Sequence, residues 1–202
     1  QDDGKNLTLC DDYYLTTTDM VIKGSNMGIT DMTKLVNNYD TKDSEAVRLA
    51  KRWGVDETTA RRAAILHDCT KALSEKEQLT LCQKWNIMYD YGENDFEALI
   101  HADTGAEAAR REFRMPDDIV DAIRTHTTGD GEMTTLQKIL YVADMCEETR
   151  TWPGVEDLRA LALTDLEAAV TSAMERTAAF IREQGREPYY KTLDALKLRK
   201  RR

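Results

Sequence analysis

The spacing of apolar residues predicts helices along most of the chain. From about residue 43 onward, apolar positions recur at helical spacing, and short polar or glycine-containing segments interrupt them. Residues 1–42 differ, because the stretch YYLTTTDMVI is rich in β-branched and aromatic residues and has no helical period. We therefore expect a compact all-α bundle over residues 43–202, preceded by an irregular extension over residues 1–42. The predicted helices cover 43–54, 55–68, 74–85, 96–113, 116–127, 134–145 and 165–185, with a short last helix after residue 191.

Local signals predict where several of these helices begin and end. Ser74–Glu77 and Thr134–Gln137 have the spacing of a capping box, in which each side chain bonds the other residue's backbone N–H. Thr164–Glu167 has the same spacing and is expected to cap the long helix that follows it. The run AAILHDCTKAL, residues 63–73, is expected to be helical throughout. The helix over 96–113 is expected to break near His101–Gly105.

Polar residues lie on helix faces that otherwise point inward. His67, for example, follows Ala60 and Ala64 at helical spacing, and Lys71 continues the same face. The inward set comprises all three histidines and two aspartates: His67, Asp68, His101, His126 and Asp144. A buried carboxylate without a partner is strongly unfavourable. Two interpretations remain open, a hydrogen-bonded polar network in the core and a metal site, and imidazole with carboxylate suits Fe, Mn, Co or Zn.

Composition and charge exclude some classes of function. The chain has 37 acidic and 28 basic residues and a formal net charge of −9, which disfavours binding of DNA or RNA through phosphate contacts. The basic tail at 197–202 is interpreted as solvated. No segment is apolar enough to span a membrane. The four cysteines lack the spacing of a disulfide framework or a CxxC motif, so we expect reduced thiols and a cytoplasmic protein.

Four blocks of sequence resemble a known family. They read AAILHDCTKALS, LIHADTGAEAA, IVDAIRTHTTGDGEMTTLQKILYVADM and RTWPGVEDLRALALTDLEAA, in family order and with family-like gaps. Together they resemble the HD-domain metal-dependent phosphohydrolases, and more closely the YqeK family of bacterial symmetrical bis(5′-nucleosyl)-tetraphosphatases. The resemblance covers roughly residues 43–195 and implies that residues 43–202 form an HD domain.

The resemblance also implies a metal centre and roles for particular residues. The family's ligands fall on matching positions, and the implied metal ligands are His67, Asp68, His101, His126 and Asp144. Asp68 would bridge two metals, and Lys71 and Arg150 would face the phosphates, so these three residues are the implied catalytic set. The implied cofactor is a di-iron centre, with Mn, Co or Mg as alternatives.

The implied reaction is hydrolysis of a dinucleoside tetraphosphate in its middle. A metal-activated hydroxide would convert diadenosine tetraphosphate to two ADP. The partner is a small nucleotide, with no nucleic acid and no membrane, and a homodimer is left open. The chain departs from the family in two places. Asn38, with Asp40 close by, lies about where the family has a first histidine, and the segment ending at Arg150 lacks the family's proline.

These departures keep two alternative functions open. One is an HD phosphohydrolase that acts on another nucleotide. The other is a catalytically impaired nucleotide-binding protein, because the first histidine of the family is absent and no histidine precedes His67.

Overall fold

The computed structural model describes residues 44–201, apart from the side chains of residues 93 and 94. Within this range the chain forms helices and no strands, which confirms the all-α prediction. The predicted extension over 1–42, with Asn38 and Asp40, lies outside the described residues. The helices are α3 (Glu45–Trp53), α4 (Glu57–Leu66), α5 (Glu75–Trp85), α6 (Glu93–Arg111), α7 (Asp117–Thr125), α8 (Thr135–Cys146), α9 (Val155–Thr164), α10 (Leu166–Glu183) and α11 (Tyr190–Arg199).

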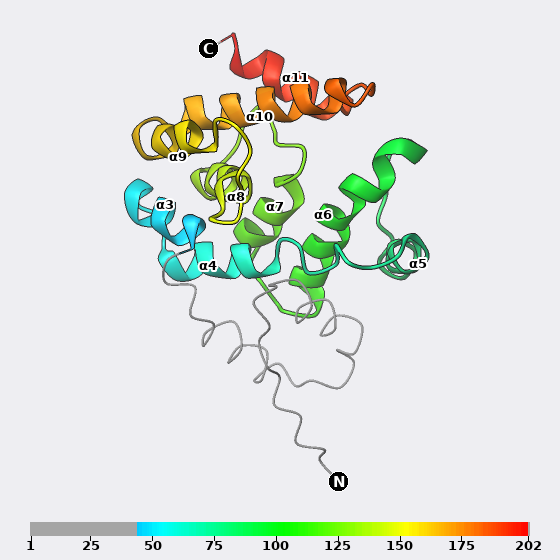
Figure 1. The fold of residues 1–202 in the computed structure, drawn as a ribbon. Helices are drawn as coiled ribbons and strands as arrows, with labels where there is room; N and C mark the ends of the chain where they lie inside the picture. Colours follow the sequence, from blue (N-terminus) through cyan, green and yellow to red (C-terminus); the bar gives the residue numbers. More distant parts are fainter. Residues whose placement is uncertain (1–43, 202) are drawn as a thin grey trace.

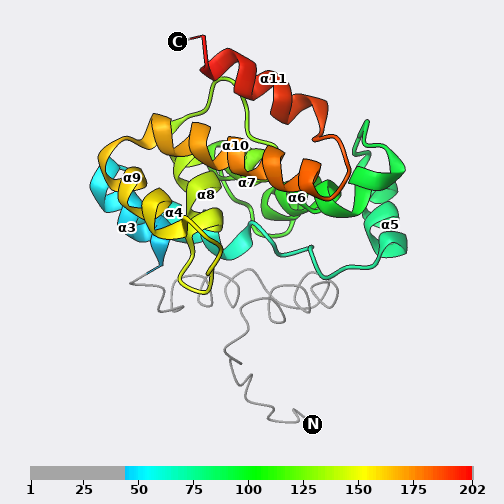
Figure 2. The same cartoon turned by 45° about the horizontal axis from the view of Figure 1, so that its top comes forward.

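α8 occupies the centre of the bundle. It contacts α3 and α4 on one side, α7 on another, and α9 and α10 on a third (Figure 1). α10 packs on α8 and α9, and α11 lies across α10 (Figure 2). The core between these helices consists of aliphatic side chains that are almost completely buried, among them Leu49, Leu66, Ile119, Ile123, Ile139, Leu140 and Met174. None of the helices between residues 44 and 201 combines the length and apolar character needed to cross a bilayer.

Two of the three predicted capping boxes are confirmed. Ser74 with Glu77 and Thr134 with Gln137 both form complete capping boxes. The prediction for Thr164–Glu167 is wrong, because Thr164 is the last residue of α9 and Asp165 caps α10 by accepting from the Ala168 N–H at 3.0 Å. α10 therefore begins one residue later than the expected box would place it, and the hydroxyl of Thr164 donates to carbonyls of α9 instead. The sequence pattern does not predict α9.

α6 does not break at His101–Gly105, contrary to the prediction, and runs without interruption. Gly105 has a packing role instead. A Cβ at this position would lie 3.3 Å from the backbone oxygen of His67 and 3.5 Å from Oγ1 of Thr70. The missing side chain therefore lets α6 approach the segment that follows α4 closely.

The segment 63–73 is helical only to Leu66, so the prediction of a continuous helix is wrong. His67 is the C-cap of α4, and a series of tight turns follows it. The N–H of Cys69 donates to the carbonyl of Leu66 at 3.1 Å, and the N–H of Lys71 donates to that of Asp68 at 3.0 Å. These three-residue bonds tighten the chain as it meets α6. Asp68 and Lys71 thus project from a turn rather than from a helix face.

Three of the cysteines, Cys69, Cys82 and Cys146, are buried free thiols, in agreement with the expectation of reduced cysteines. Burial raises the pKa of the Cys69 thiol to about 12, which keeps it protonated beside Asp68. Cys10 lies outside the described residues.

Candidate metal centre

The structure brings the five inward residues together from four parts of the chain. His67 ends α4 and Asp68 follows it in the turn. His101 lies in the middle of α6, His126 is the C-cap of α7, and Asp144 lies in the last turn of α8. Asp68, His101 and His126 are each at most 5% exposed.

Asp68 lies at the centre of the cluster, and its two oxygens face different histidines. Oδ1 is 3.2 Å from Nε2 of His101 and 3.4 Å from Nε2 of His126. Oδ2 is 3.4 Å from Nε2 of His67, and that same nitrogen is 3.7 Å from Oδ1 of Asp144. One ligand atom from each of His67, Asp68 and His126 lies within 4.8 Å of the others, a spacing that a single metal ion can span.

The proton positions on two of the rings follow from their backbone contacts. Nδ1 of His67 lies 2.7 Å from the carbonyl oxygen of Ala64, and Nδ1 of His126 lies 2.6 Å from that of Ile123. A carbonyl can only accept, so both Nδ1 atoms carry a proton and donate it. In a neutral ring Nε2 then holds a lone pair, and this lone pair faces a carboxylate oxygen of Asp68. Two acceptors that face each other require a cation between them.

Buried polar atoms without hydrogen bonds point to the same requirement. Among the described residues, the buried side-chain atoms that lack a hydrogen-bond partner include Nε2 of His67 and Oδ1 of Asp68. Both atoms face the cluster, and leaving them unsatisfied is unfavourable by several kcal/mol in an apolar interior. Imidazole nitrogens and carboxylate oxygens are ligands of divalent transition metals. The residues present therefore fit a divalent cation.

The charges of the cluster shift the pKa values of its members strongly. Burial opposes protonation of His67, but the carboxylates of Asp68 and Asp144 outweigh burial and raise the pKa of His67 to about 10. Burial would raise the pKa of Asp68 and of Asp144, yet the neighbouring His67 holds both carboxyl pKa values below their usual range. Burial lowers the pKa of His101 to about 4, so this ring is neutral and able to bind a metal. Without a metal, a proton on His67 is the cation that balances the two carboxylates.

The two basic residues singled out in the sequence lie at the rim of the cluster. Nζ of Lys71 donates to Oδ2 of Asp68 at 2.8 Å, and Nη2 of Arg150 donates to Oδ1 of Asp144 at 3.0 Å. The Lys71 side chain is 44% exposed and that of Arg150 is 37% exposed. Both cations therefore contact a carboxylate of the cluster and also reach solvent, where an anion could meet them.

A buried polar network behind the cluster was not predicted in full from the sequence. Oγ1 of Thr70 donates to the carbonyl of His101 at 3.0 Å, and Nε2 of Gln78 donates to the carbonyl of Thr70 at 2.6 Å. Oγ1 of Thr104 donates to Oε1 of Gln78 at 2.6 Å. These bonds join the turn after α4 to α5 and α6 and fix the backbone beside Asp68. Gln78 was missed, and its only signal is that it shares a face of α5 with the apolar residues Cys82 and Trp85.

The comparison with known families agrees with this geometry. The model of the HD domain family matches residues 45–149, a stretch that contains the five cluster residues. The chain belongs to the HD domain family. A solved structure from Clostridium acetobutylicum, described as a predicted HD superfamily hydrolase involved in NAD metabolism, is similar at a TM-score of 0.72 and 32% identity. The alignment covers 86% of this chain and 96% of that one.

Two relatives that carry the same enzyme name are similar to this chain over most of its length. A protein of Halalkalibacterium halodurans is 39% identical over 73% of this chain and 79% of its own length. A protein of Bacillus subtilis is 39% identical over 67% of this chain and 73% of its own length. Both relatives carry the name symmetrical bis(5′-nucleosyl)-tetraphosphatase.

Proposed function

We propose that the chain is a metal-dependent symmetrical bis(5′-nucleosyl)-tetraphosphatase that hydrolyses diadenosine tetraphosphate to two ADP. The observation that carries the proposal is the convergence of three imidazole Nε2 atoms on the single carboxylate of Asp68. The names of the 39% identical relatives support the substrate. Lys71 and Arg150 at the rim support an anionic ligand, since the chain as a whole carries a formal charge of −9.

In this proposal His67, Asp68, His101, His126 and Asp144 hold the metal. Because the two oxygens of Asp68 face different histidines, this residue would be able to help hold two cations. Oδ1 of Asp68 lies near Nε2 of His101 and of His126. Oδ2 lies near Nε2 of His67, and that nitrogen also lies near Oδ1 of Asp144. We propose iron, with Mn or Co as alternatives, because imidazoles outnumber carboxylates in the set. Mg is the weakest alternative, since it prefers oxygen ligands.

The bound cations would polarise phosphate oxygens and lower the pKa of a water molecule. The chain's own residues prepare the site for that chemistry. The backbone carbonyls of Ala64 and Ile123 accept from Nδ1 of His67 and His126, which turns both Nε2 lone pairs toward the centre. Lys71 and Arg150 offset the charge of the phosphates and of the departing ADP.

The proposal is tested by elemental analysis of anaerobically purified protein together with a panel of nucleotides. The panel contains diadenosine tetraphosphate, a nucleoside monophosphate, a cyclic nucleotide and NAD, and chromatography separates the products. We expect one to two iron atoms per chain and ADP as the only product from the tetraphosphate. AMP with ATP as products, or turnover of another panel member alone, would assign a different substrate. Protein without metal and without turnover after addition of Fe or Mn would favour a binding protein.

We also include a cytoplasmic location in the proposal, on the strength of the free buried thiols. Whether the chain forms a homodimer is a separate question, and size-exclusion chromatography with light scattering measures the oligomeric state.

A further inference from the structure

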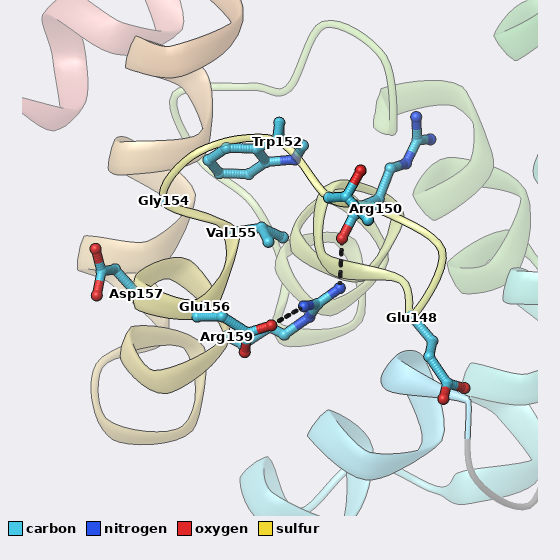
Figure 3. A pocket seen from close by; sticks show the side chains of 9 residues that line it. Glu148, Arg150, Trp152, Gly154, Val155, Glu156, Asp157 and Arg159 are labelled. Carbon is cyan, nitrogen blue, oxygen red and sulfur yellow. Dashed lines mark hydrogen bonds and ion pairs between the residues drawn. The ribbon is translucent and has the colours of Figure 1, made fainter.

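Arg159 lies behind the loop that carries Arg150. The loop joins the end of α8 to the start of α9, and Arg159 is on the second turn of α9. Loop and helix line a pocket of about 430 Å³, and the guanidinium of Arg159 lies across it (Figure 3). Figure 3 also shows that the carbonyl of Arg150 points toward Arg159, while its side chain points away.

The guanidinium of Arg159 binds three backbone carbonyls of this segment. Nε donates to the carbonyl of Cys146 at 2.8 Å, and Nη2 donates to those of Glu147 at 2.6 Å and Arg150 at 3.0 Å. Nη1 donates to the side chain of Glu156 at 2.5 Å. The Arg159 side chain is only 15% exposed, and its nitrogens are thus occupied by the chain itself.

Two of these three carbonyls lie at the C-terminal end of α8, and that of Glu147 also accepts from the backbone N–H of Arg150 at 2.9 Å. Cys146 is the last residue of α8 and Glu147 is its C-cap, so their carbonyls have no intrahelical donor. A cation at a helix C-terminus also complements the helix dipole. One planar group with several N–H donors satisfies all three carbonyls, which lysine with its single nitrogen cannot do in the same geometry.

The same loop delivers Arg150 to the metal centre. Nη2 of Arg150 donates to Oδ1 of Asp144, and its Nε donates to the carbonyl of Asp144 at 3.2 Å. Since Arg159 holds the Arg150 backbone from the other side, a shift of the loop would move the Arg150 guanidinium away from Asp144 and from any bound phosphate.

We propose that Arg159 is a positioning residue, which acts on phosphate binding and turnover by fixing the loop that presents Arg150. This inference rests on the proposed function, in which Arg150 faces the phosphates. It assigns no contact between Arg159 and the substrate.

A double-mutant cycle between Arg159 and Arg150 tests the inference. Wild type, R159Q, R150Q and the double variant are compared for kcat/KM with diadenosine tetraphosphate. The dissociation constant of inorganic tripolyphosphate, measured by calorimetry on the metal-loaded proteins, gives a second cycle that does not depend on turnover. We expect R159Q to lower kcat/KM by roughly 10- to 100-fold and to weaken tripolyphosphate binding by about tenfold. In the R150Q background the same change should have less than about a twofold effect.

Two further variants and metal analysis separate positioning from general stability. E156Q removes the negative charge of the exposed partner of Arg159 but leaves the three carbonyl bonds, and it should behave like wild type. R159K keeps the charge but loses the bridging geometry, and it should show most of the loss even if R159Q does not fold. Metal content should be unchanged in R159K and R159Q.

Several outcomes would overturn the inference. These are equal effects of R159Q in both backgrounds, full activity of R159K, or a loss of metal that matches the loss of activity. A wild type that does not cleave diadenosine tetraphosphate but binds tripolyphosphate contradicts the proposed function, and the binding cycle then still decides the role of Arg159. If the wild type binds no tripolyphosphate and is inactive, Arg150 faces no phosphate and both proposals fail.

Discussion

At the scale of single residues, the proposed chemistry depends on Asp68 and on what its two oxygens face. A carboxylate that is 5% exposed and lies 3.2 to 3.4 Å from three imidazole nitrogens has few alternatives to holding a cation. The sequence period placed the histidines on inward faces, but it could not show that their Nε2 atoms converge. That convergence depends on how α4, α6, α7 and α8 pack against one another, which is a tertiary feature.

Replacing Asp68 is the most direct test of the ligand assignment. D68A and the isosteric D68N should both abolish activity and metal binding, because neither side chain supplies a negative charge between the histidines. The fold should be largely kept, as seen by circular dichroism. T80A, which removes an exposed hydroxyl of α5, serves as the control and should retain metal and activity. An active, metal-loaded D68N protein would refute the bridging role.

The pKa of His67 predicts how the stability of the metal-free protein depends on pH. Folding raises this pKa from 6.5 to about 10, so the charged ring stabilises the folded state fully below pH 6.5. That contribution is lost as the pH rises from 6.5 through about 10. After removal of metal by chelation, the free energy of unfolding is measured by urea titration at a series of pH values. It should fall over this pH range in wild type by more than in H67Q. If the free energies of unfolding of wild type and H67Q change with pH in the same way, the His67 ring carries no extra proton in the folded state.

At the scale of elements, helix ends were predictable where one or two neighbouring residues determine them, as in the capping boxes at Ser74 and Thr134. The end of α4 at Leu66 and the continuity of α6 were not. The two segments meet at Gly105, where α6 approaches the turn closely although the two are far apart in sequence. Local sequence patterns contain no information on how closely two distant segments pack. They therefore could not predict that α4 ends at Leu66 or that α6 is continuous.

The network of Thr70, Thr104 and Gln78 is the element-scale feature that holds the turn against α6. Q78A would leave the carbonyl of Thr70 without its Gln78 donor and the hydroxyl of Thr104 without that acceptor. We expect the free energy of unfolding to fall by about 2 kcal/mol. Metal affinity should fall by roughly 10- to 100-fold, as for other changes behind metal ligands. Urea titration and metal titration measure the two effects, and T80A on the same helix is the matched control.

At the scale of the whole molecule, the proposed ligands join α4, α6, α7 and α8, so a bound metal links most of the bundle. Binding to the folded state alone should stabilise it by about 2.7 kcal/mol when the free metal is 100 times its dissociation constant. Thermal unfolding of metal-free and Mn-loaded wild type measures this difference. D68N should show no such shift, and an equal shift in D68N would place the stabilising metal elsewhere.

The span of the proposed ligand set along the chain has a consequence for biosynthesis. The first ligand is at residue 67 and the last is at residue 144, so no partial product that ends before α8 contains the complete set. A growing polypeptide can therefore complete the proposed ligand set only after α8 has left the ribosome.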